Sequence, residues 1–258
     1  MKLSILVPVF NEAGTVRDVF AHLFSSTCPI EREWIVIDDA STDGTREILR
    51  ELSGKHGFRL LEQEKNAGKG AAVRRGIEAA EGQVILIQDA DFEYDPGDIP
   101  ALIEPICNGT ADVVFGSRFS KNGRQVHRTY HYLVNRVLTV LSNLMSGIYL
   151  TDMETCYKAF RADLLKAMRL RSNRFGVEVE LTAYTAKTAA RILELPIHYY
   201  PRTYLQGKKI TWRDGVSALL HLIRFNYLIS ASEAFHGLPA CYGSRSNLLL
   251  RAPTSHQQ

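Results

Sequence analysis

Cysteine is scarce in this sequence, and long apolar runs are absent. The 258 residues include four cysteines, which lie far apart and form no C-x-x-C pair: Cys28, Cys107, Cys156 and Cys241. This spacing excludes zinc ribbons and thioredoxin-like redox motifs and indicates a reduced, cytoplasmic compartment. No stretch reaches the roughly 20 apolar residues of a membrane span. The apolar segment 3–10 is too short for a secretory signal and is interrupted by Pro8. We therefore expect a protein that is soluble or peripheral to a membrane.

Two common phosphate-binding motifs are also missing. The G-x-x-x-x-G-K-[ST] spacing of a P-loop is absent, and no G-x-G-x-x-G follows the first apolar segment. The first absence argues against a P-loop nucleotide-binding protein. The second makes a dehydrogenase a poor interpretation, because its glycine fingerprint is what brings the backbone close to a pyrophosphate.

The formal net charge of +3 conceals an uneven distribution along the chain. Residues 1–100 contain 11 basic and 18 acidic residues, a net charge of −7, whereas residues 101–258 contain 20 and 10, a net charge of +10. Two segments, 117–136 and 201–213, carry several Arg and Lys residues and no acidic residue. We expect no nucleic-acid partner, because neither segment forms a recognisable binding motif and the acidic half would repel a nucleic-acid backbone. A phosphorylated substrate beside a metal site accounts for both halves.

Short aliphatic runs alternate with amphipathic ones in the first half of the chain. The runs predict buried strands at 3–9, 34–37, 58–61, 84–87 and 113–115, separated by helices at 13–25, 45–52, 70–80 and 99–106. This alternation indicates an α/β fold with a mostly parallel central sheet and helices on both faces. Further helices are predicted at 133–150, 177–188 and 212–229, and a flexible tail at 230–258. Ligands of such sheets bind at the carboxyl ends of the strands.

The pair Asp89-x-Asp91 directly follows the predicted strand 84–87. Two carboxylates at alternate positions can converge on Mg²⁺ or Mn²⁺, which leave coordination positions open for substrate phosphates. A solvated acidic turn is the simpler interpretation of an isolated D-x-D. The buried strand before it and the other acidic residues at strand ends, such as Asp38, Asp39 and Glu93, favour the metal site. The intact Asp89-x-Asp91 pair also argues against a non-catalytic binding or scaffold protein.

Two further polar segments are expected at the same edge of the sheet. Asp38 and Asp39 can accept hydrogen bonds from a nucleotide, while Ser41, Thr42 or Asp43 caps the next helix and leaves Asp39 free. Segment 66–70, Asn-Ala-Gly-Lys-Gly, is a glycine-bearing loop that enters a helix and suits an anion or close approach of a substrate. Its lysine has an alternative interpretation as an ordinary surface residue.

These motifs, in this order, resemble family 2 glycosyltransferases of the GT-A fold, the fold of nucleotide-diphospho-sugar transferases. The first part of the resemblance rests on segments 4–12, 36–44, 66–70, 88–91 and 116–118. Segments 150–158, 174–176 and 199–203 resemble the branch that transfers mannose or glucose to polyprenyl (dolichyl) phosphate. The resemblance implies one GT-A domain over 1–229, with a nucleotide-sugar and metal half at 1–118 and an acceptor half with amphipathic helices at 119–229.

The resemblance also assigns roles to individual residues. It implies Mg²⁺ or Mn²⁺ held by Asp89, Asp91 and Glu93, the last standing where relatives often have Gln. The implied catalytic residues are Asp89, Asp91, Arg118 and Arg128. The implied nucleotide-sugar contacts are Pro8, Phe10, Glu12, Ile37, Asp39, Asp89, Ala90, Asp91, Arg118, Arg202 and Lys208.

The implied reaction is an inverting, metal-dependent transfer of a hexose from GDP-mannose or UDP-glucose to a polyprenyl phosphate. An anionic lipid phosphate needs no general base. The alternative acceptor is a hydroxyl of a glycan or other polymer, which needs a carboxylate such as Glu154 or Asp152. A lipid acceptor implies peripheral binding at the cytoplasmic face of a membrane, through helix 133–150 or 212–229, and leaves room for a separate membrane-protein partner.

Overall fold

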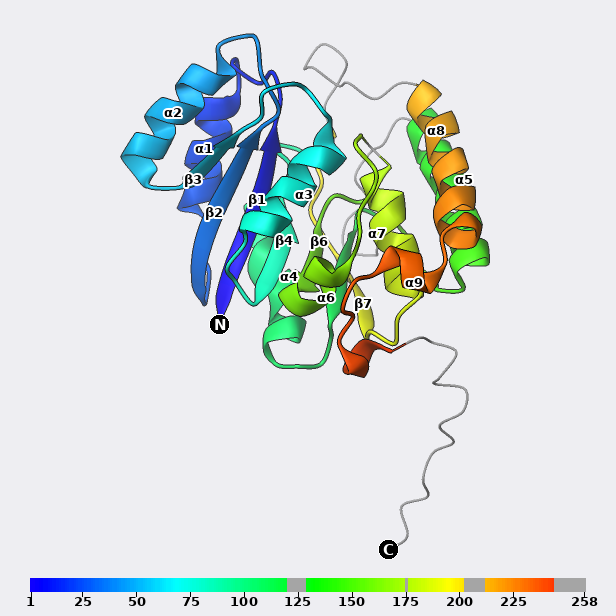
Figure 1. The fold of residues 1–258 in the computed structure, drawn as a ribbon. Helices are drawn as coiled ribbons and strands as arrows, with labels where there is room; N and C mark the ends of the chain where they lie inside the picture. Colours follow the sequence, from blue (N-terminus) through cyan, green and yellow to red (C-terminus); the bar gives the residue numbers. More distant parts are fainter. Residues whose placement is uncertain (120–128, 175, 202–211, 244–258) are drawn as a thin grey trace, which may run out of the picture.

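A seven-stranded sheet forms the centre of the computed structural model, which describes residues 1–119, 129–174, 176–201 and 212–243 (Figure 1). The strands are β1 Lys2–Val9, β2 Glu31–Asp38, β3 Arg59–Glu62, β4 Val84–Ile87, β5 Val113–Ser117, β6 Lys158–Arg161 and β7 Ile192–Pro196. Their order across the sheet is β3-β2-β1-β4-β6-β5-β7. Only β6 runs against its neighbours, β4 and β5. The predicted α/β fold with a mostly parallel sheet is confirmed.

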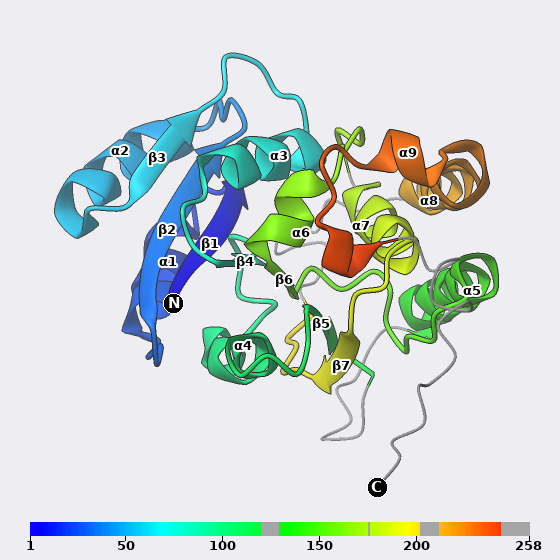
Figure 2. The same ribbon diagram turned by 60° about the horizontal axis from the view of Figure 1, so that its bottom comes forward.

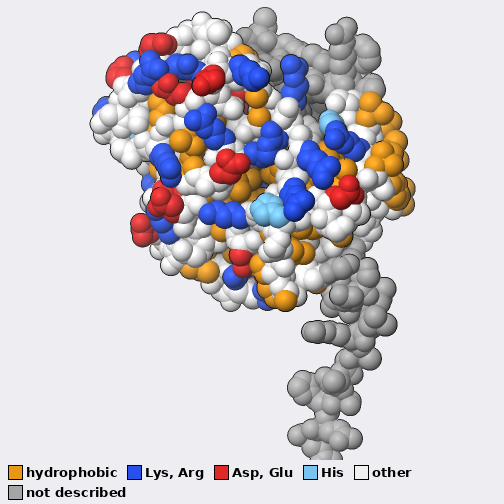
Figure 3. Space-filling model, viewed as in Figure 1, with side chains coloured by type: hydrophobic (Ala, Val, Ile, Leu, Met, Phe, Trp, Pro, Cys, Tyr) orange, Lys and Arg blue, Asp and Glu red, His pale blue; other side chains and the backbone are white. Residues whose placement is uncertain are grey.

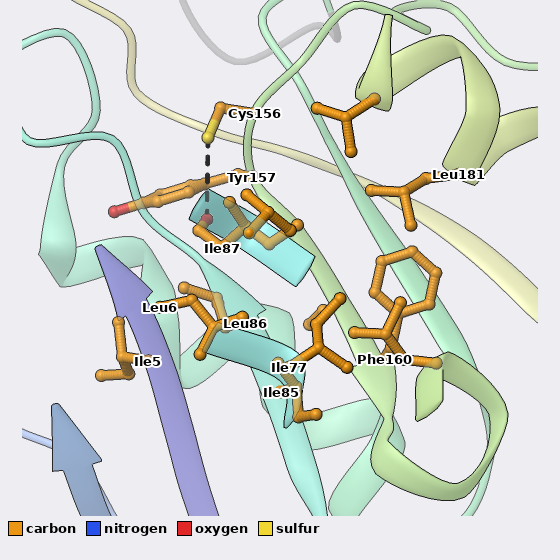
Figure 4. Packing of buried hydrophobic residues seen from close by; sticks show 14 of the residues in the cluster. Ile5, Leu6, Ile77, Ile85, Leu86, Ile87, Cys156, Tyr157, Phe160 and Leu181 are labelled. Atoms are coloured by element: carbon orange, nitrogen blue, oxygen red, sulfur yellow. Dashed lines mark hydrogen bonds between the residues drawn. The ribbon is translucent and has the colours of Figure 1, made fainter. Parts of the chain in front are cut away.

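Helices cover both faces of the sheet, as predicted. They are α1 Val16–Ser25, α2 Thr45–His56, α3 Lys69–Ala79, α4 Ile99–Cys107 and α6 Ala162–Ala167. Helices α3 and α6 lie on one face and α4 on the other (Figure 2). Because β1 and β4 are covered on both sides, their aliphatic side chains are almost all fully buried. Figure 4 shows Leu6 of β1, Leu86 of β4, Ile77 of α3 and Phe160 of β6 in one continuous core.

Three helices of the second half stand beside the sheet. They are α5 Thr129–Ser146, α7 Val177–Ala186 and α8 Trp212–Ile223. Helices α5 and α8 lie side by side at the edge of the molecule, and both contact α7 (Figure 1). All ten residues of α7 are buried, as expected for a helix enclosed on every side. A short π-helical turn at Arg224–Leu228 follows α8. Within the described residues, no helix combines the length and the apolarity that a bilayer crossing requires.

The structure differs from the sequence-based prediction in two places. Strands β6 and β7 and helix α6 have no counterpart among the predicted elements. In addition, the predicted tail does not begin at 230, because residues 231–243 include helix α9, Ala231–Ala234, and a short 3-10 turn, Ala240–Tyr242. Phe235 and Tyr242 are buried, and Phe235 pairs with Met168 in an isolated β-bridge. Two aromatic anchors therefore fix a segment whose Gly, Ser and Pro content predicts flexibility.

Candidate active site

The Asp89-x-Asp91 turn lies at the carboxyl end of β4, where the sequence places it. Tyr157, from the segment that enters β6, fixes this turn through its hydroxyl, whose single proton is shared between Gln88 Oε1 at 2.5 Å and the Asp95 carbonyl oxygen at 3.0 Å. Asp91 is buried, and its Oδ1 accepts the Glu93 amide at 2.9 Å. The turn is thus shaped by its own carboxylate and by an element of the second half of the chain.

Asp89 is paired with Lys69, the first residue of α3. The Lys69 ammonium lies 2.7 Å from Asp89 Oδ1 and 2.8 Å from Glu178 Oε1. Burial opposes a charged lysine, but the nearby acidic groups, Asp89 foremost, raise the pKa of Lys69 well above its usual value. Lys69 is therefore a cation enclosed in the site. The interpretation of Lys69 as an ordinary surface residue is wrong, and the signal that favoured the site was its place in a glycine-bearing loop at the strand edge.

Asp39 holds the loop that precedes α3. Its carboxylate accepts hydrogen bonds from the Ala67 and Gly68 amides, at 2.8 and 2.7 Å, and from Gln63 Nε2 at 2.7 Å. Burial raises the pKa of Asp39, although the two amide hydrogen bonds oppose the shift. The prediction that Asp39 remains free is wrong, because the loop at 66–70 turns its backbone donors toward this carboxylate.

The same loop packs directly on the segment that leads into α7. Gly68 has a φ of +92°, and a Cβ at this position would collide with the Asn173 carbonyl oxygen. A Cβ at Gly70 would collide with the Ser172 carbonyl oxygen. Arg74 of α3 donates to that same carbonyl at 2.6 Å. The glycines therefore permit a backbone-to-backbone contact that brings α3 and α7 together.

The ends of β1 and β2 carry two non-glycine residues in the left-handed region, Asn11 at φ 52° and Ala40 at φ 59°. The Asn11 amide donates to Ser41 Oγ at 2.9 Å, and Asn11 Oδ1 accepts the Thr42 amide at 2.8 Å. Such backbone conformations persist where surrounding contacts impose them, and they concentrate at functional sites. Here the contacts tie the two loops into one surface.

The predicted nucleoside-contacting residues are distributed around this surface. Pro8, Phe10 and Glu12 are partly exposed at the end of β1, and the Glu12 amide donates to Thr45 Oγ1 at 2.9 Å. Ile37 is different, because its side chain is fully buried and packs beneath α3. Ala90 is buried within the Asp89–Asp91 turn.

Arg118, at the end of β5, forms a buried ion pair with Asp152. Its Nε and Nη2 atoms lie 2.7 and 2.8 Å from the two Asp152 carboxylate oxygens, and its amide also donates to Asp152. The guanidinium carbon lies 5.1 Å from the centre of the Tyr199 ring. Asp152 is fully buried. With these three donors its carboxylate is a poor candidate for a general base.

Glu154, unlike Asp152, has a carboxylate oxygen to which no group in the described part of the chain donates. Its Oε1 atom is buried and has no hydrogen-bond partner among the described residues. Burial, followed by the charge of Glu178, raises the pKa of Glu154 to about 7, against the opposing charges of Lys158 and Arg118. Asp152 has its two oxygens occupied by Arg118, whereas Glu154 has an unpartnered oxygen and a pKa near neutrality, which suits a general base.

Three of the other predicted site residues lie outside the described residues: Arg128, Arg202 and Lys208. Glu93 is partly exposed, and its carbonyl oxygen accepts the Tyr200 amide at 2.8 Å. Within the described part of the chain, no three acidic, His or Cys side chains converge as a ready metal site. The donor chemistry nevertheless fits a hard divalent cation, because Asp89 is a carboxylate that already pairs with a cation, the Lys69 ammonium.

Solved structures define the class of fold. Glucosyl-3-phosphoglycerate synthase from Mycobacterium tuberculosis, in complex with Mn²⁺, UDP and phosphoglyceric acid, aligns with a TM-score of 0.66 at 20% identity, covering 88% of this chain and 78% of that one. The Mg²⁺ and UDP complex of the same enzyme aligns with a TM-score of 0.66 at 21% identity, covering 87% and 79%. The sheet and its helices therefore form a GT-A fold.

The sequence places the chain within that class. The model of the family described as "Glycosyl transferase family 2" matches residues 4–169, and the chain belongs to this family.

Similar curated proteins include three that are named for polyprenyl-phosphate chemistry. Dolichol-phosphate mannosyltransferase of Pyrococcus furiosus is 28% identical over 81% of this chain and 61% of its own length. Undecaprenyl-phosphate mannosyltransferase of Micrococcus luteus is 30% identical over 81% and 87%. Dodecaprenyl-phosphate galacturonate synthase of Rhizobium johnstonii is 28% identical over 97% and 75%. The chain thus spans less than two thirds of the first of these relatives. Each of the three names joins a sugar to a polyprenyl phosphate, with mannose in two of them and galacturonate in the third.

Proposed function

We propose that this chain transfers a hexose from a nucleotide sugar, GDP-mannose or UDP-glucose, to a polyprenyl phosphate, with inversion at the anomeric carbon and with Mg²⁺ or Mn²⁺ bound. The relatives' names support the acceptor class. The observation in the structure that carries the proposal is a broad apolar surface on α5 and α8.

The apolar surface is formed by large hydrophobic side chains, which soluble proteins seldom expose together. On α5 they recur at helical spacing, with Leu133 58% and Leu144 75% exposed, and on α8 Leu220 is 63% exposed. Among the residues whose side chains the structure describes, the set is Tyr132, Leu133, Val137, Val140, Leu144 and Tyr149 from α5 and the loop after it, and Leu219, Leu220, Ile223, Tyr227 and Leu228 from α8 and its π-helical turn. Figure 3 shows hydrophobic side chains gathered along this edge of the molecule. Leu138 and Leu222 pack inward instead. The outward faces suit insertion into a membrane surface.

The chemistry follows from the charges at the strand edge. Asp89 and Asp91 would hold the divalent cation, which supplies Lewis-acid stabilisation of the charge that develops on the departing nucleoside diphosphate. Lys69, held as a buried cation, adds positive charge at the same edge. A lipid phosphate is anionic at neutral pH and attacks the anomeric carbon without losing a proton to the protein. Arg118, Arg128, Arg202 and Lys208 are proposed to contact the phosphates of donor or acceptor.

The direct test is transfer of labelled sugar to a short polyprenyl phosphate, with GDP-mannose and UDP-glucose supplied separately together with Mn²⁺. We expect a lipid-linked product with one donor, and loss of that product in Asp91→Ala. Failure to form lipid-linked sugar with any common nucleotide sugar, by protein that still binds GDP or UDP, contradicts the acceptor assignment.

The membrane surface is tested separately by sedimentation with lipid vesicles. Leu144→Asp and Leu220→Asp place a charge on the apolar surface and should each weaken vesicle binding roughly tenfold or more, because a buried leucine contributes about 1.5–3 kcal/mol. Ala21→Asp, an exposed apolar-to-acid change on α1, is the matched control. Equal vesicle binding by all three variants and the parent contradicts a membrane role for α5 and α8.

A hydroxyl acceptor is the second candidate, and Glu154 is the observation that favours it. A carboxyl group with a pKa of about 7 can take a proton from a hydroxyl nucleophile near neutral pH. Glu154→Gln should then lower kcat and remove an ionisation near pH 7 from the rate profile, whereas transfer to a lipid phosphate should retain most of its rate.

A further inference from the structure

The ammonium of Lys69 is shared between two carboxylates from distant parts of the chain. It lies 2.7 Å from Asp89, after β4, and 2.8 Å from Glu178, in the first turn of α7. The three side chains are 14%, 23% and 8% exposed. Such an enclosed ion pair lowers the stability of the folded protein unless each partner is held by further contacts. The position of Glu178 on the fully buried helix α7 therefore needs an explanation.

We propose that Glu178 is a positioning residue, which retains Lys69 in the donor site when a divalent cation takes over Asp89. The inference rests on the proposed function only in assuming that a divalent cation binds the Asp89 carboxylate. Without that cation, Lys69 is the counter-ion of Asp89. A cation arriving at Asp89 repels the ammonium, and Glu178 is the second carboxylate to which the ammonium remains bound.

Backbone contacts hold Lys69 and Glu178 close to each other. Gly68 and Gly70 flank Lys69, and both touch the segment 172–174 that leads into α7, with no room for a Cβ at either position. The Ala71 amide of α3 donates to the Asn173 carbonyl oxygen at 3.2 Å. The start of α3 and the start of α7 therefore cannot separate without breaking several contacts, and Lys69 stays within reach of Glu178 whichever cation Asp89 binds.

The proposal makes a prediction for metal binding that needs neither donor nor acceptor. Free Mn²⁺ is titrated against the full chain by electron paramagnetic resonance. Lys69→Met removes the competing ammonium and should tighten Mn²⁺ binding about tenfold. Glu178→Gln leaves Lys69 with Asp89 as its remaining carboxylate partner and should weaken Mn²⁺ binding by a similar factor, within the usual range of coupling between charged sites.

The double variant separates positioning from simple attraction. If Glu178 acts through Lys69, Glu178→Gln should have little effect on Mn²⁺ affinity in the Lys69→Met background. If its negative charge merely attracts the cation, the loss will be the same in both backgrounds, and the proposal is overturned. An unchanged Mn²⁺ affinity in Glu178→Gln also overturns it, as does the absence of Mn²⁺ binding by the parent and by Lys69→Met alike.

A matched control is present at the opposite end of β1. Lys2 also bridges two carboxylates, Glu33 at 2.9 Å and Glu81 at 3.1 Å, and Lys2→Met should leave Mn²⁺ affinity unchanged. Thermal unfolding of each variant reports folding independently, and Glu178→Asp provides a milder change if Glu178→Gln does not fold. Absence of sugar transfer to a polyprenyl phosphate would refute the proposed function while leaving these Mn²⁺ affinities as a valid test.

Discussion

Replacing Glu154 with Gln removes a buried ionisable group without changing its size. The pKa of Glu154 is about 7 in the folded protein, against 4.5 for an unperturbed glutamate. The main cause is burial, and the second is the charge of Glu178. Lys158, whose own pKa is lowered by burial, belongs to the same coupled cluster.

The sign of the effect follows from the direction of this shift. A carboxyl group with a raised folded-state pKa favours folding while it is protonated. Its contribution is fully present below pH 4.5 and is lost as the pH rises through about 7. At about 1.4 kcal/mol per pKa unit, the loss amounts to roughly 3 kcal/mol. Glu154→Gln should therefore match the parent near pH 4 and exceed its free energy of unfolding by up to roughly 3 kcal/mol at pH 8.

Urea unfolding from pH 4 to pH 8 measures this difference directly. Glu51→Gln is a useful control, because Glu51 is exposed and its pKa is lowered by Arg17, so that any pH dependence it contributes has the opposite sign. Parallel curves of unfolding free energy against pH for the parent and Glu154→Gln would refute the assignment of a raised pKa to this cluster.

Two other substitutions test the geometry of the site. Asp152→Ala should lower the free energy of unfolding by about 3–5 kcal/mol, because it leaves the Arg118 guanidinium buried without its partner; a loss below 1 kcal/mol in urea would show that the pair is dispensable. Gly70→Ala should weaken GDP or UDP binding and lower the melting temperature, because its methyl group meets the Ser172 carbonyl oxygen. Gly54→Ala, in α2 with open space around its Cβ position, should instead raise stability by about 0.5–1 kcal/mol, and equal melting temperatures for the two glycine variants would contradict the predicted clash.

Burial makes two strands, β1 and β4, easy to predict from the sequence. β1 and β4 are aliphatic along most of their length because both faces of the sheet are covered. β6 was missed because its sequence is Lys-Ala-Phe-Arg, which has no apolar run. Its fully buried Lys158 is accommodated by the carbonyl oxygens of Met153 and Thr155, which accept from its ammonium. These are contacts that a local pattern does not encode.

The candidate site also has some features that a local sequence pattern predicts and others that depend on contacts between distant segments. The position of Asp89-x-Asp91 after a strand is a local property, and it was predicted. The partner of Lys69 and the hydrogen bonds of Asp39 depend on how separate loops meet, so the sequence alone indicated only that the residues share an edge. The role of Asp152 as the partner of Arg118 is of the same kind.

The position of β6 in the sheet has a consequence for the order of folding. β6 lies between β4 and β5 and pairs with both. A nascent chain that has reached residue 118 contains β4 and β5 but lacks the strand that joins them, and it also lacks the Glu178 partner of Lys69. Residues 1–118 hold most of the side chains that we propose to contact the nucleotide, yet their sheet closes only after residues 158–161 have been synthesised. Such long-range pairing slows folding, and it makes assembly of the proposed donor site a late event that requires the second half of the chain.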